Sequence, residues 1–154
     1  MRKKIIWIAI ICIFLLTACN QETDQNTQDP NKNPSIEQIN TNSNIIRQQP
    51  SNKAKELLSQ FEEVTEVHAV NTKHTLLVTV NIEHHKRFML AKKRKQYQKL
   101  LEQEFKGEHV ELSTDKKILI ETREIEKKIK QNDITNKQIN KEVDRIIHLA
   151  REQT

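Results

Sequence analysis

The stretch that decides the fold is Thr75-Leu76-Leu77-Val78-Thr79-Val80-Asn81-Ile82. Its even-numbered residues are all apolar, and this period of two predicts a β-strand with one face in the core. In the extended segment before it, the same period places Val64, Glu66, His68 and Val70 on one face. Residues 71–74 are typical of a turn, so the two segments predict a β-hairpin with one buried face.

Apolar residues at helical spacing lie on both sides of this hairpin. Residues 53–63 precede it and predict a helix that Ser51 or Asn52 can cap. Residues 83–106 follow it without a glycine or proline, and their apolar pattern is helical. Gly107, the single glycine of the chain, is placed to end that second helix.

The last third of the chain predicts one more strand and more helix. Residues 109–113 form a short strand pattern, and Thr135 with Gln138 forms a capping box that starts a C-terminal helix. Residues 117–121 are compatible with a fourth strand. The spacing of Ile118, Thr122, Ile125 and Ile129 favours instead a helix over 116–130.

The predicted fold class is α+β, with element order αββαβα and an additional C-terminal helix. We expect a small three-stranded, antiparallel-type sheet covered by helices on one face. The aromatic residues Phe61, Phe88, Tyr97 and Phe105 lie at positions that predict burial in its core.

The N-terminus has the layout of a secretory signal. Three basic residues, Arg2 to Lys4, precede an apolar run of 12 residues from Ile5 to Leu16. This run is shorter than the roughly 20 residues that span a hydrocarbon core. The following Leu16-Thr17-Ala18-Cys19 resembles the lipobox of bacterial lipoproteins. That resemblance implies cleavage before Cys19 and attachment of diacylglycerol and acyl chains to its thiol, which would hold the protein at a membrane.

Four regions follow from these patterns: a signal peptide over 1–18, a tether over 19–52, an α+β domain over 53–131, and a C-terminal amphipathic helix over 132–154. In residues 20–52, 14 of 33 residues are Asn or Gln, and all three prolines lie there. Such a segment buries too little apolar surface to order itself. Ile45-Ile46 is its expected docking point on the domain.

Composition excludes several classes of function. Cys12 lies in the signal and Cys19 is the acylation site, so no thiol remains for a disulfide, metal site or nucleophile. One glycine excludes glycine-rich phosphate loops. Adjacent His84 and His85 point about 100° apart on a helix, and His68 and His74 lack a metal-site spacing. We therefore expect no metal and no cofactor.

No catalytic residue is predicted either. The carboxylates of Glu62, Glu63 and Glu66 fit a solvated polar surface, and Ser113-Thr114-Asp115 fits a helix cap rather than a hydrolase motif.

A basic run is the one feature with a direct functional implication. Removing the signal leaves 23 basic and 21 acidic residues, yet seven of the basic residues fall within positions 86–99. We expect Lys86, Arg87, Lys92, Lys93 and Lys95 to contact an anionic surface, each contributing about 1 kcal/mol near charged lipid. The alternatives are a solvated helix surface or a protein partner. Nucleic acid is not an expected partner of an exported protein, and the oligomeric state is left open.

Three pieces of the chain together resemble the YhcN/YlaJ-type sporulation lipoproteins of spore-forming Gram-positive bacteria. They are the lipobox, the strand ending in Leu76-Leu77-Val78-Thr79-Val80, and the run from Val110 through Lys117-Ile118 into Leu119–Ile129. The resemblance covers residues 53–131 and the lipobox, and the chain departs from longer members in its few glycines and its 133–154 helix. It implies attachment to the outer face of the cell or forespore membrane, with the spore inner membrane preferred. It also implies a non-catalytic supporting role in germination or outgrowth.

Two other classes of function are alternatives. One is an exported envelope- or ligand-binding lipoprotein unrelated to spores, and the other is an envelope hydrolase. Expression confined to the forespore would favour the sporulation class over the first of these. A pocket with converging titratable groups would favour the hydrolase.

Overall fold

A computed structural model describes residues 36–41 and 44–152. The predicted signal, the lipobox and Cys19 lie outside these residues. The elements, in chain order, are α2 (Gln49–Ser59), β1 (Val64–Asn71), β2 (Thr75–Ile82), η1 (His84–Met89), α3 (Leu90–Glu104), β3 (His109–Ser113), α4 (Lys116–Lys130) and α5 (Asn136–Glu152). The α+β class and the element order are as predicted, and the segment 116–130 is a helix.

The three strands form one mixed sheet in the order β1-β2-β3. Strands β1 and β2 pair antiparallel as a hairpin, with Val67 opposite Val80. Strand β3 pairs with β2 in parallel, with Leu76 opposite Val110. The expectation of an antiparallel sheet is therefore wrong for β3. The connection through η1 and α3 is long enough to return the chain in the same direction, as parallel pairing requires.

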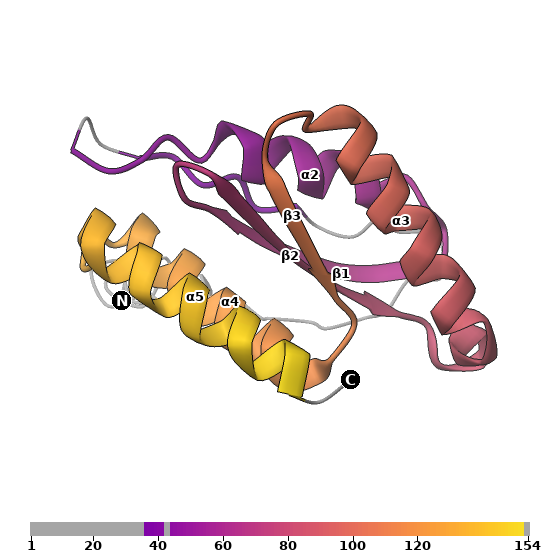
Figure 1. The fold of residues 1–154 in the computed structure, drawn as a ribbon. Helices are drawn as coiled ribbons and strands as arrows, with labels where there is room; N and C mark the ends of the chain where they lie inside the picture. Colours follow the sequence, from indigo (N-terminus) through magenta and orange to yellow (C-terminus); the bar gives the residue numbers. More distant parts are fainter. Residues whose placement is uncertain (1–35, 42–43, 153–154) are drawn as a thin grey trace, which may run out of the picture. The chain divides into compact units, whose positions relative to one another are not determined.

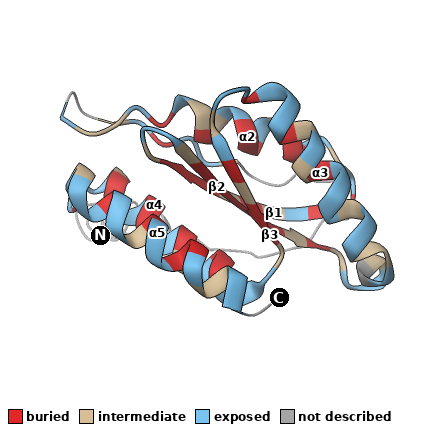
Figure 2. Cartoon of the chain, in the orientation of Figure 1, coloured by how far each residue is buried: buried red, intermediate tan, exposed pale blue. Residues whose placement is uncertain are grey.

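Helices cover both faces of this sheet, which corrects the prediction of one covered face. Helices α2 and α3 lie on one side, and α4 and α5 lie on the other (Figure 1). Each side has its own cluster of buried apolar residues. Leu76, Val78 and Val80 of β2 belong to the first cluster. Leu77 of the same strand belongs to the second cluster. Figure 2 accordingly shows β2 buried along most of its length.

A bulge in β1 sets which side chains face which layer. The register shifts between Val64 and Glu66, where Val64 pairs with Ile82 and Glu66 pairs with Asn81. One extra residue reverses the alternation. Val64 therefore joins the first cluster. Glu66 and His68 keep the opposite orientation, toward α4. The prediction that Val64 shares the face of Glu66 and His68 is wrong for this reason.

Helix α2 begins at Gln49, four residues before the predicted start. The segment before it packs on the domain: Ile39 is only 3% exposed and lies in the second cluster. The expectation that residues 20–52 bury too little apolar surface to order themselves is therefore wrong at this point. Ile45 packs on the same cluster, and the Ile46 N–H donates to Asn136 Oδ1 at 2.8 Å. Docking at Ile45-Ile46 is confirmed.

Two predicted helix signals are observed in the structure. Asp115 caps α4, because its Oδ1 accepts hydrogen bonds from the Lys117 and Ile118 N–H groups at 2.8 and 3.0 Å. Thr135 and Gln138 form the capping box of α5. The apolar stripe of α5, formed by Ile139, Val143, Ile146 and Ile147, packs inside the second cluster. No helix within 36–41 and 44–152 is long and apolar enough to cross a bilayer.

Candidate functional site

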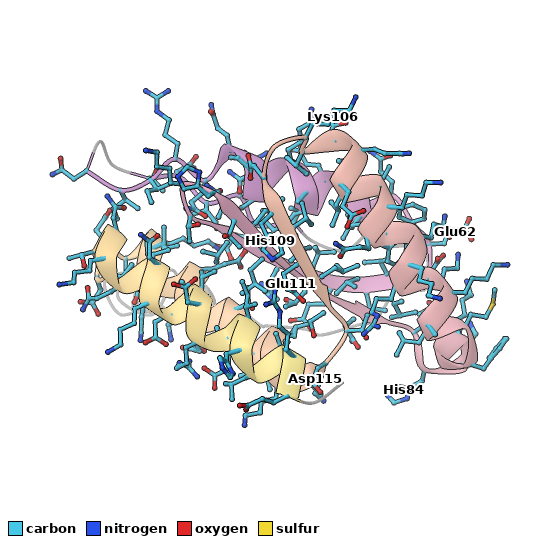
Figure 3. The ribbon with its side chains drawn as sticks, in the orientation of Figure 1. Glu62, His84, Lys106, His109, Glu111 and Asp115 are labelled. Carbon is cyan, nitrogen blue, oxygen red and sulfur yellow. The ribbon has the colours of Figure 1, made fainter. Side chains whose placement is uncertain are left out.

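The basic run lies on η1 and the first half of α3. Lys92 and Lys95 are exposed on α3. Lys86 is half-buried, with its Nζ 3.8 Å from Glu83 Oε2. Arg87 is in η1, and its side chain lies outside the part that the structure describes. In Figure 3, the label His84 marks the start of η1, from which the basic run continues into α3.

Lys93 differs from its neighbours because it has a buried partner. Its Nζ lies 2.5 Å from Glu63 Oε1, and its side chain is only 20% exposed. The same carboxylate accepts a hydrogen bond from the buried Tyr97 hydroxyl at 2.6 Å. Burial by itself raises the pKa of Glu63, but the hydrogen bonds from Lys93 and Tyr97 outweigh it and lower the pKa to about 2. The interpretation of Glu63 as solvated charge is therefore wrong.

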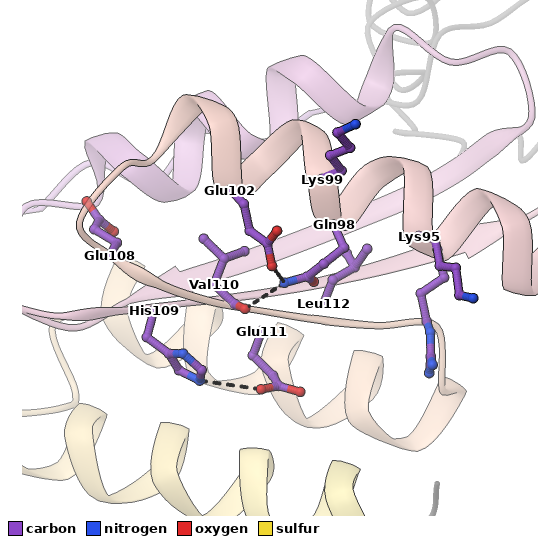
Figure 4. A pocket seen from close by; sticks show the side chains of 10 residues that line it. Lys95, Gln98, Lys99, Glu102, Glu108, His109, Val110, Glu111 and Leu112 are labelled. Carbon is purple, nitrogen blue, oxygen red and sulfur yellow. Dashed lines mark hydrogen bonds and ion pairs between the residues drawn. The ribbon is translucent and has the colours of Figure 1, made fainter.

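A groove of about 600 Å³ runs between α3 and the outer edge of β3 (Figure 4). Charges of both signs line it, with Arg94, Lys95, Lys99 and Glu102 on α3, Glu108 just before β3 and Glu111 on β3. Gln98 crosses the groove, donating from Nε2 to the Val110 carbonyl at 2.9 Å and to Glu102 Oε1 at 2.7 Å. Burial raises the pKa of Glu108, whose Oε2 has no hydrogen-bond partner among the described residues. These titratable groups do not converge on one point.

The structure also contains a buried charge cluster that was not predicted from the sequence. Glu126 of α4 is 3% exposed and Lys55 of α2 is 1% exposed. Lys55 Nζ lies 3.0 Å from Glu126 Oε1, and it also donates to the Glu37 carbonyl at 2.6 Å. His68 Nδ1 lies 2.6 Å from Glu126 Oε2. His68 Nε2 lies 2.9 Å from Glu66 Oε1.

The charges in this cluster stabilise one another. Burial raises the pKa of Glu126, but the bonds from His68 and Lys55 outweigh it and lower the pKa below the usual value. Burial lowers the pKa of Lys55, and Glu126 only partly offsets this effect. Burial also disfavours charged His68, but its two carboxylate partners, Glu126 and Glu66, raise its pKa. The arrangement therefore favours an imidazolium between two carboxylates.

The cluster also covers the free edge of β1. The Ala69 N–H donates to Glu126 Oε1 at 3.0 Å. Two residues along, Gln48 accepts from the Asn71 N–H at 3.0 Å and donates to the Asn71 carbonyl at 2.9 Å. Side chains thus take the place of a neighbouring strand, which protects the edge from pairing with another chain. This arrangement explains the cluster as a structural feature.

The remaining histidines lie apart from one another. His68 is opposite Thr79 within the sheet, whereas His74 is in the turn, so the hairpin does not pair them. His84 and His85 are exposed on η1. Within the described ranges, no group of three His, Cys, Asp or Glu side chains is arranged to hold a metal ion. The prediction that Phe88 is buried is wrong, because its side chain is 84% exposed.

The family is identified by comparison with known proteins. A family model described as sporulation lipoprotein YhcN/YlaJ matches residues 17–148, a wider span than the resemblance in sequence alone covered. Searches of curated proteins and of solved structures gave no match. Since the matched region covers most of the chain and begins at Thr17, within the predicted lipobox, this protein belongs to the YhcN/YlaJ family of sporulation lipoproteins.

Proposed function

We propose that this protein is anchored by acyl chains on Cys19 to a spore membrane, where it supports germination or outgrowth without catalysing a reaction. The observation that carries the proposal is the extent of the family match, which begins two residues before Cys19 and runs through the folded domain to residue 148. The proposed acylation site and the domain thus lie within one family match. The residues between them form a tether outside the outer face of the membrane.

The geometry supports a binding role better than a catalytic one. The acidic groups that are buried in the described part, Glu63 and Glu126, already bind cations and hydroxyl or amide donors. A general acid or base needs a proton that it can exchange with a substrate. The exposed Lys92 and Lys95 are instead available to an anionic surface. Lys93 contributes less to such a contact because Glu63 holds it.

Acylation is tested by Cys19→Ala. The variant is expected to lose label from a fatty-acid precursor and to leave the membrane fraction, because each buried CH₂ contributes about 0.8 kcal/mol to anchoring. The unchanged protein, produced at the same level, is the control. Continued labelling and continued flotation of the variant with membranes would exclude Cys19 as the anchor.

The biological role is tested in a spore-forming host that lacks the protein. Its spores are expected to form but to lose refractility more slowly after nutrients are added, and the unchanged gene should restore the rate. Cys19→Ala should restore it only in part. Expression in vegetative cells, together with normal germination of the deletion strain, would favour an exported envelope- or ligand-binding lipoprotein instead.

A further inference from the structure

Phe88 is the most anomalous side chain on the described surface. Its side chain is 84% exposed, whereas the other exposed large apolar residue in that part of the chain, Ile120, is 42% exposed. The remaining described aromatic rings pack on the first core cluster. Phe88 belongs to η1, the six-residue turn that connects β2 to α3. Packing of the domain therefore gives no reason for a phenylalanine at this position.

Basic residues surround Phe88 in the chain. Lys86 precedes it by two positions, and Lys92 and Lys95 follow it by four and seven. Lys92 and Lys95 are three apart on α3, so both project from the same side of the helix. Glu83 is the acidic residue nearest in sequence, and it is already 3.8 Å from Lys86 and 3.2 Å from His85. The result is an exposed ring in a basic stretch of the chain, in which Lys92 and Lys95 form no ion pair with another described residue.

An aromatic ring beside lysines matches the chemistry of an anionic bilayer surface. Membrane-interface segments bury apolar side chains at the headgroup boundary while their basic side chains contact lipid phosphates. The long lysine side chains can extend toward the phosphates while the ring goes deeper. A nearby lipid anchor would also hold the domain within reach of such a surface.

We propose that Phe88 inserts into the headgroup region of an anionic membrane, while Lys92 and Lys95 bind its phosphates. The proposed partner is the lipid surface. The inference deepens the proposed function and rests on its placing of the domain beside a bilayer. The contact itself involves only η1 and α3, so it can be measured without acylation of Cys19.

The sequence allows insertion to be measured by the fluorescence of a single tryptophan. Trp7 is the single tryptophan of the chain, and it is absent from a chain that starts at Asn20. That chain retains every described helix and strand, because the first begins at Gln49. Phe88→Trp then places one fluorophore at the proposed contact. Ile120→Trp, on α4 in the opposite layer, is the matched control.

With vesicles of equimolar phosphatidylglycerol and phosphatidylcholine, we expect the emission of the Phe88→Trp variant to shift to shorter wavelength and to be quenched by brominated acyl chains. The emission of the Ile120→Trp variant should not change. Vesicles of phosphatidylcholine alone should shift neither probe. The shift in Phe88→Trp should decrease steeply with added salt, because exposed charges are screened over about 10 Å at 0.1 M.

Two substitutions separate the ring from the charges. Phe88→Ser should weaken vesicle binding about tenfold, because it removes the buried apolar area of the ring. The pair Lys92→Glu and Lys95→Glu should weaken it at least about a hundredfold. The matched control is Lys127→Glu with Lys128→Glu, which makes the same change in net charge at two exposed positions in the last turn of α4 and should alter binding by less than about threefold. Circular dichroism checks that each variant is folded.

Several outcomes would overturn the proposal. One is an emission spectrum of Phe88→Trp that stays unchanged with anionic vesicles at low salt. Another is a blue shift that grows with protein concentration in the absence of lipid, which would assign Phe88 to self-association. Equal loss of binding in both charge-reversal pairs would show a non-specific attraction. A different result separates this proposal from the proposed function. If Cys19 is not acylated and the indole of Phe88→Trp still inserts, the proposed anchor is refuted and the Phe88 contact is supported.

Discussion

The ammonium group of Lys55 lies 3.0 Å from the carboxylate of Glu126, although 71 positions separate the two residues. Lys55 projects from α2 in the first layer, and Glu126 projects from α4 in the second. The pair meets beside the free edge of β1, where Glu126 also binds the Ala69 N–H at 3.0 Å. One ion pair therefore connects the two helical layers around the edge of the sheet.

The first prediction concerns the energetic coupling of this pair. Removing one member of a buried ion pair leaves the other unpaired and costs about 3–5 kcal/mol. Glu126→Leu should be more destabilising than Lys55→Met, because it leaves both the Lys55 charge and the Ala69 N–H without their partner. A separate pair of substitutions measures the coupling. Combining Lys55→Met with Glu126→Gln should cost less than the sum of Lys55→Met alone and Glu126→Gln alone. Urea unfolding in a double-mutant cycle measures this coupling.

Lys53→Met on the same helix is the control for that cycle. Lys53 pairs with Glu104, but its side chain is 56% exposed. An exposed pair contributes at most about 1 kcal/mol, so this change should be nearly neutral. Additive effects of Lys55→Met and Glu126→Gln would contradict the coupling inferred from the structure.

The second prediction is a loss of stability in mild base. The pKa of His68 in the folded protein is raised above the unfolded value of 6.5. The stabilisation from its charge is then fully present below pH 6.5 and is lost as pH rises through the folded pKa. The free energy of unfolding should therefore decrease as the pH rises above 6.5. His68→Gln should remove most of that slope.

His85→Gln is the matched control, because His85 is 72% exposed on η1. The slope should be the same in this variant as in the unchanged protein. An NMR titration of the His68 ring gives a direct check. A measured pKa below 6.5 would show that burial outweighs the two carboxylates, and the sign of the pH dependence would then be reversed.

Local sequence patterns predicted the elements well because they depend on nearest neighbours. The alternation in residues 75–82 gave a strand with those bounds, and the spacing of Ile118, Thr122 and Ile125 gave the helix Lys116–Lys130. Sheet direction and the second covered face needed non-local information. Even so, two signals were present: Leu77 is apolar on the supposedly polar face of β2, and a long helical connection before β3 is typical of a parallel strand.

The candidate sites show the same difference between features that depend on neighbouring residues and features that depend on the tertiary fold. The basic run was visible in the sequence because it is contiguous, but the pairing of Lys93 with Glu63 depends on how α3 lies against the turn that precedes β1. The Lys55–Glu126 pair had a weaker signal. Each residue lies among the buried positions of its own helix. A cation and an anion on two separate apolar stripes predict a buried pair. Which partner each would find depended on the tertiary fold.

The third prediction concerns acid stability at the other end of β1. The pKa of Glu63 is lowered from 4.5 to about 2 in the folded protein. Its contribution is therefore present above pH 4.5 and is lost as pH falls toward about 2. This shift corresponds to stabilisation on the order of 3 kcal/mol. Glu63→Gln should reduce the acid dependence of unfolding, and Glu62→Gln, at an exposed neighbour, should leave it unchanged.

An acid unfolding profile that is identical in Glu63→Gln and in the unchanged protein would contradict this prediction. The same variant tests the position of Lys93. Once the carboxylate is neutral, Lys93 is expected to extend toward solvent. Vesicle binding through α3 should then increase slightly, because one more cation becomes available to anionic lipid.

The last prediction is that the segment before α2 stabilises the domain. Ile39 is buried in the second cluster, and Gln48 is 1% exposed, with its amide bonded to the backbone of Asn71. Ile39→Ala should lower the free energy of unfolding by about 2–4 kcal/mol, because it deletes buried methyl groups and leaves a cavity. Gln48→Ala should cost about 1–3 kcal/mol, because it leaves the N–H and carbonyl of Asn71 without their partners.

Gln38→Ala is the matched control for both variants. Gln38 is exposed, and among the described residues its side chain bonds to the exposed side chain of Glu56, so its loss should change stability by less than about 0.5 kcal/mol. Thermal or urea unfolding of the chain from Asn20 compares the three variants. If Ile39→Ala were as neutral as Gln38→Ala, residues 36–48 would belong with the tether, and the domain would begin at α2. A clear loss in Ile39→Ala and Gln48→Ala would instead extend the folded domain to residue 36, which shortens the chain available to span the distance between Cys19 and the domain.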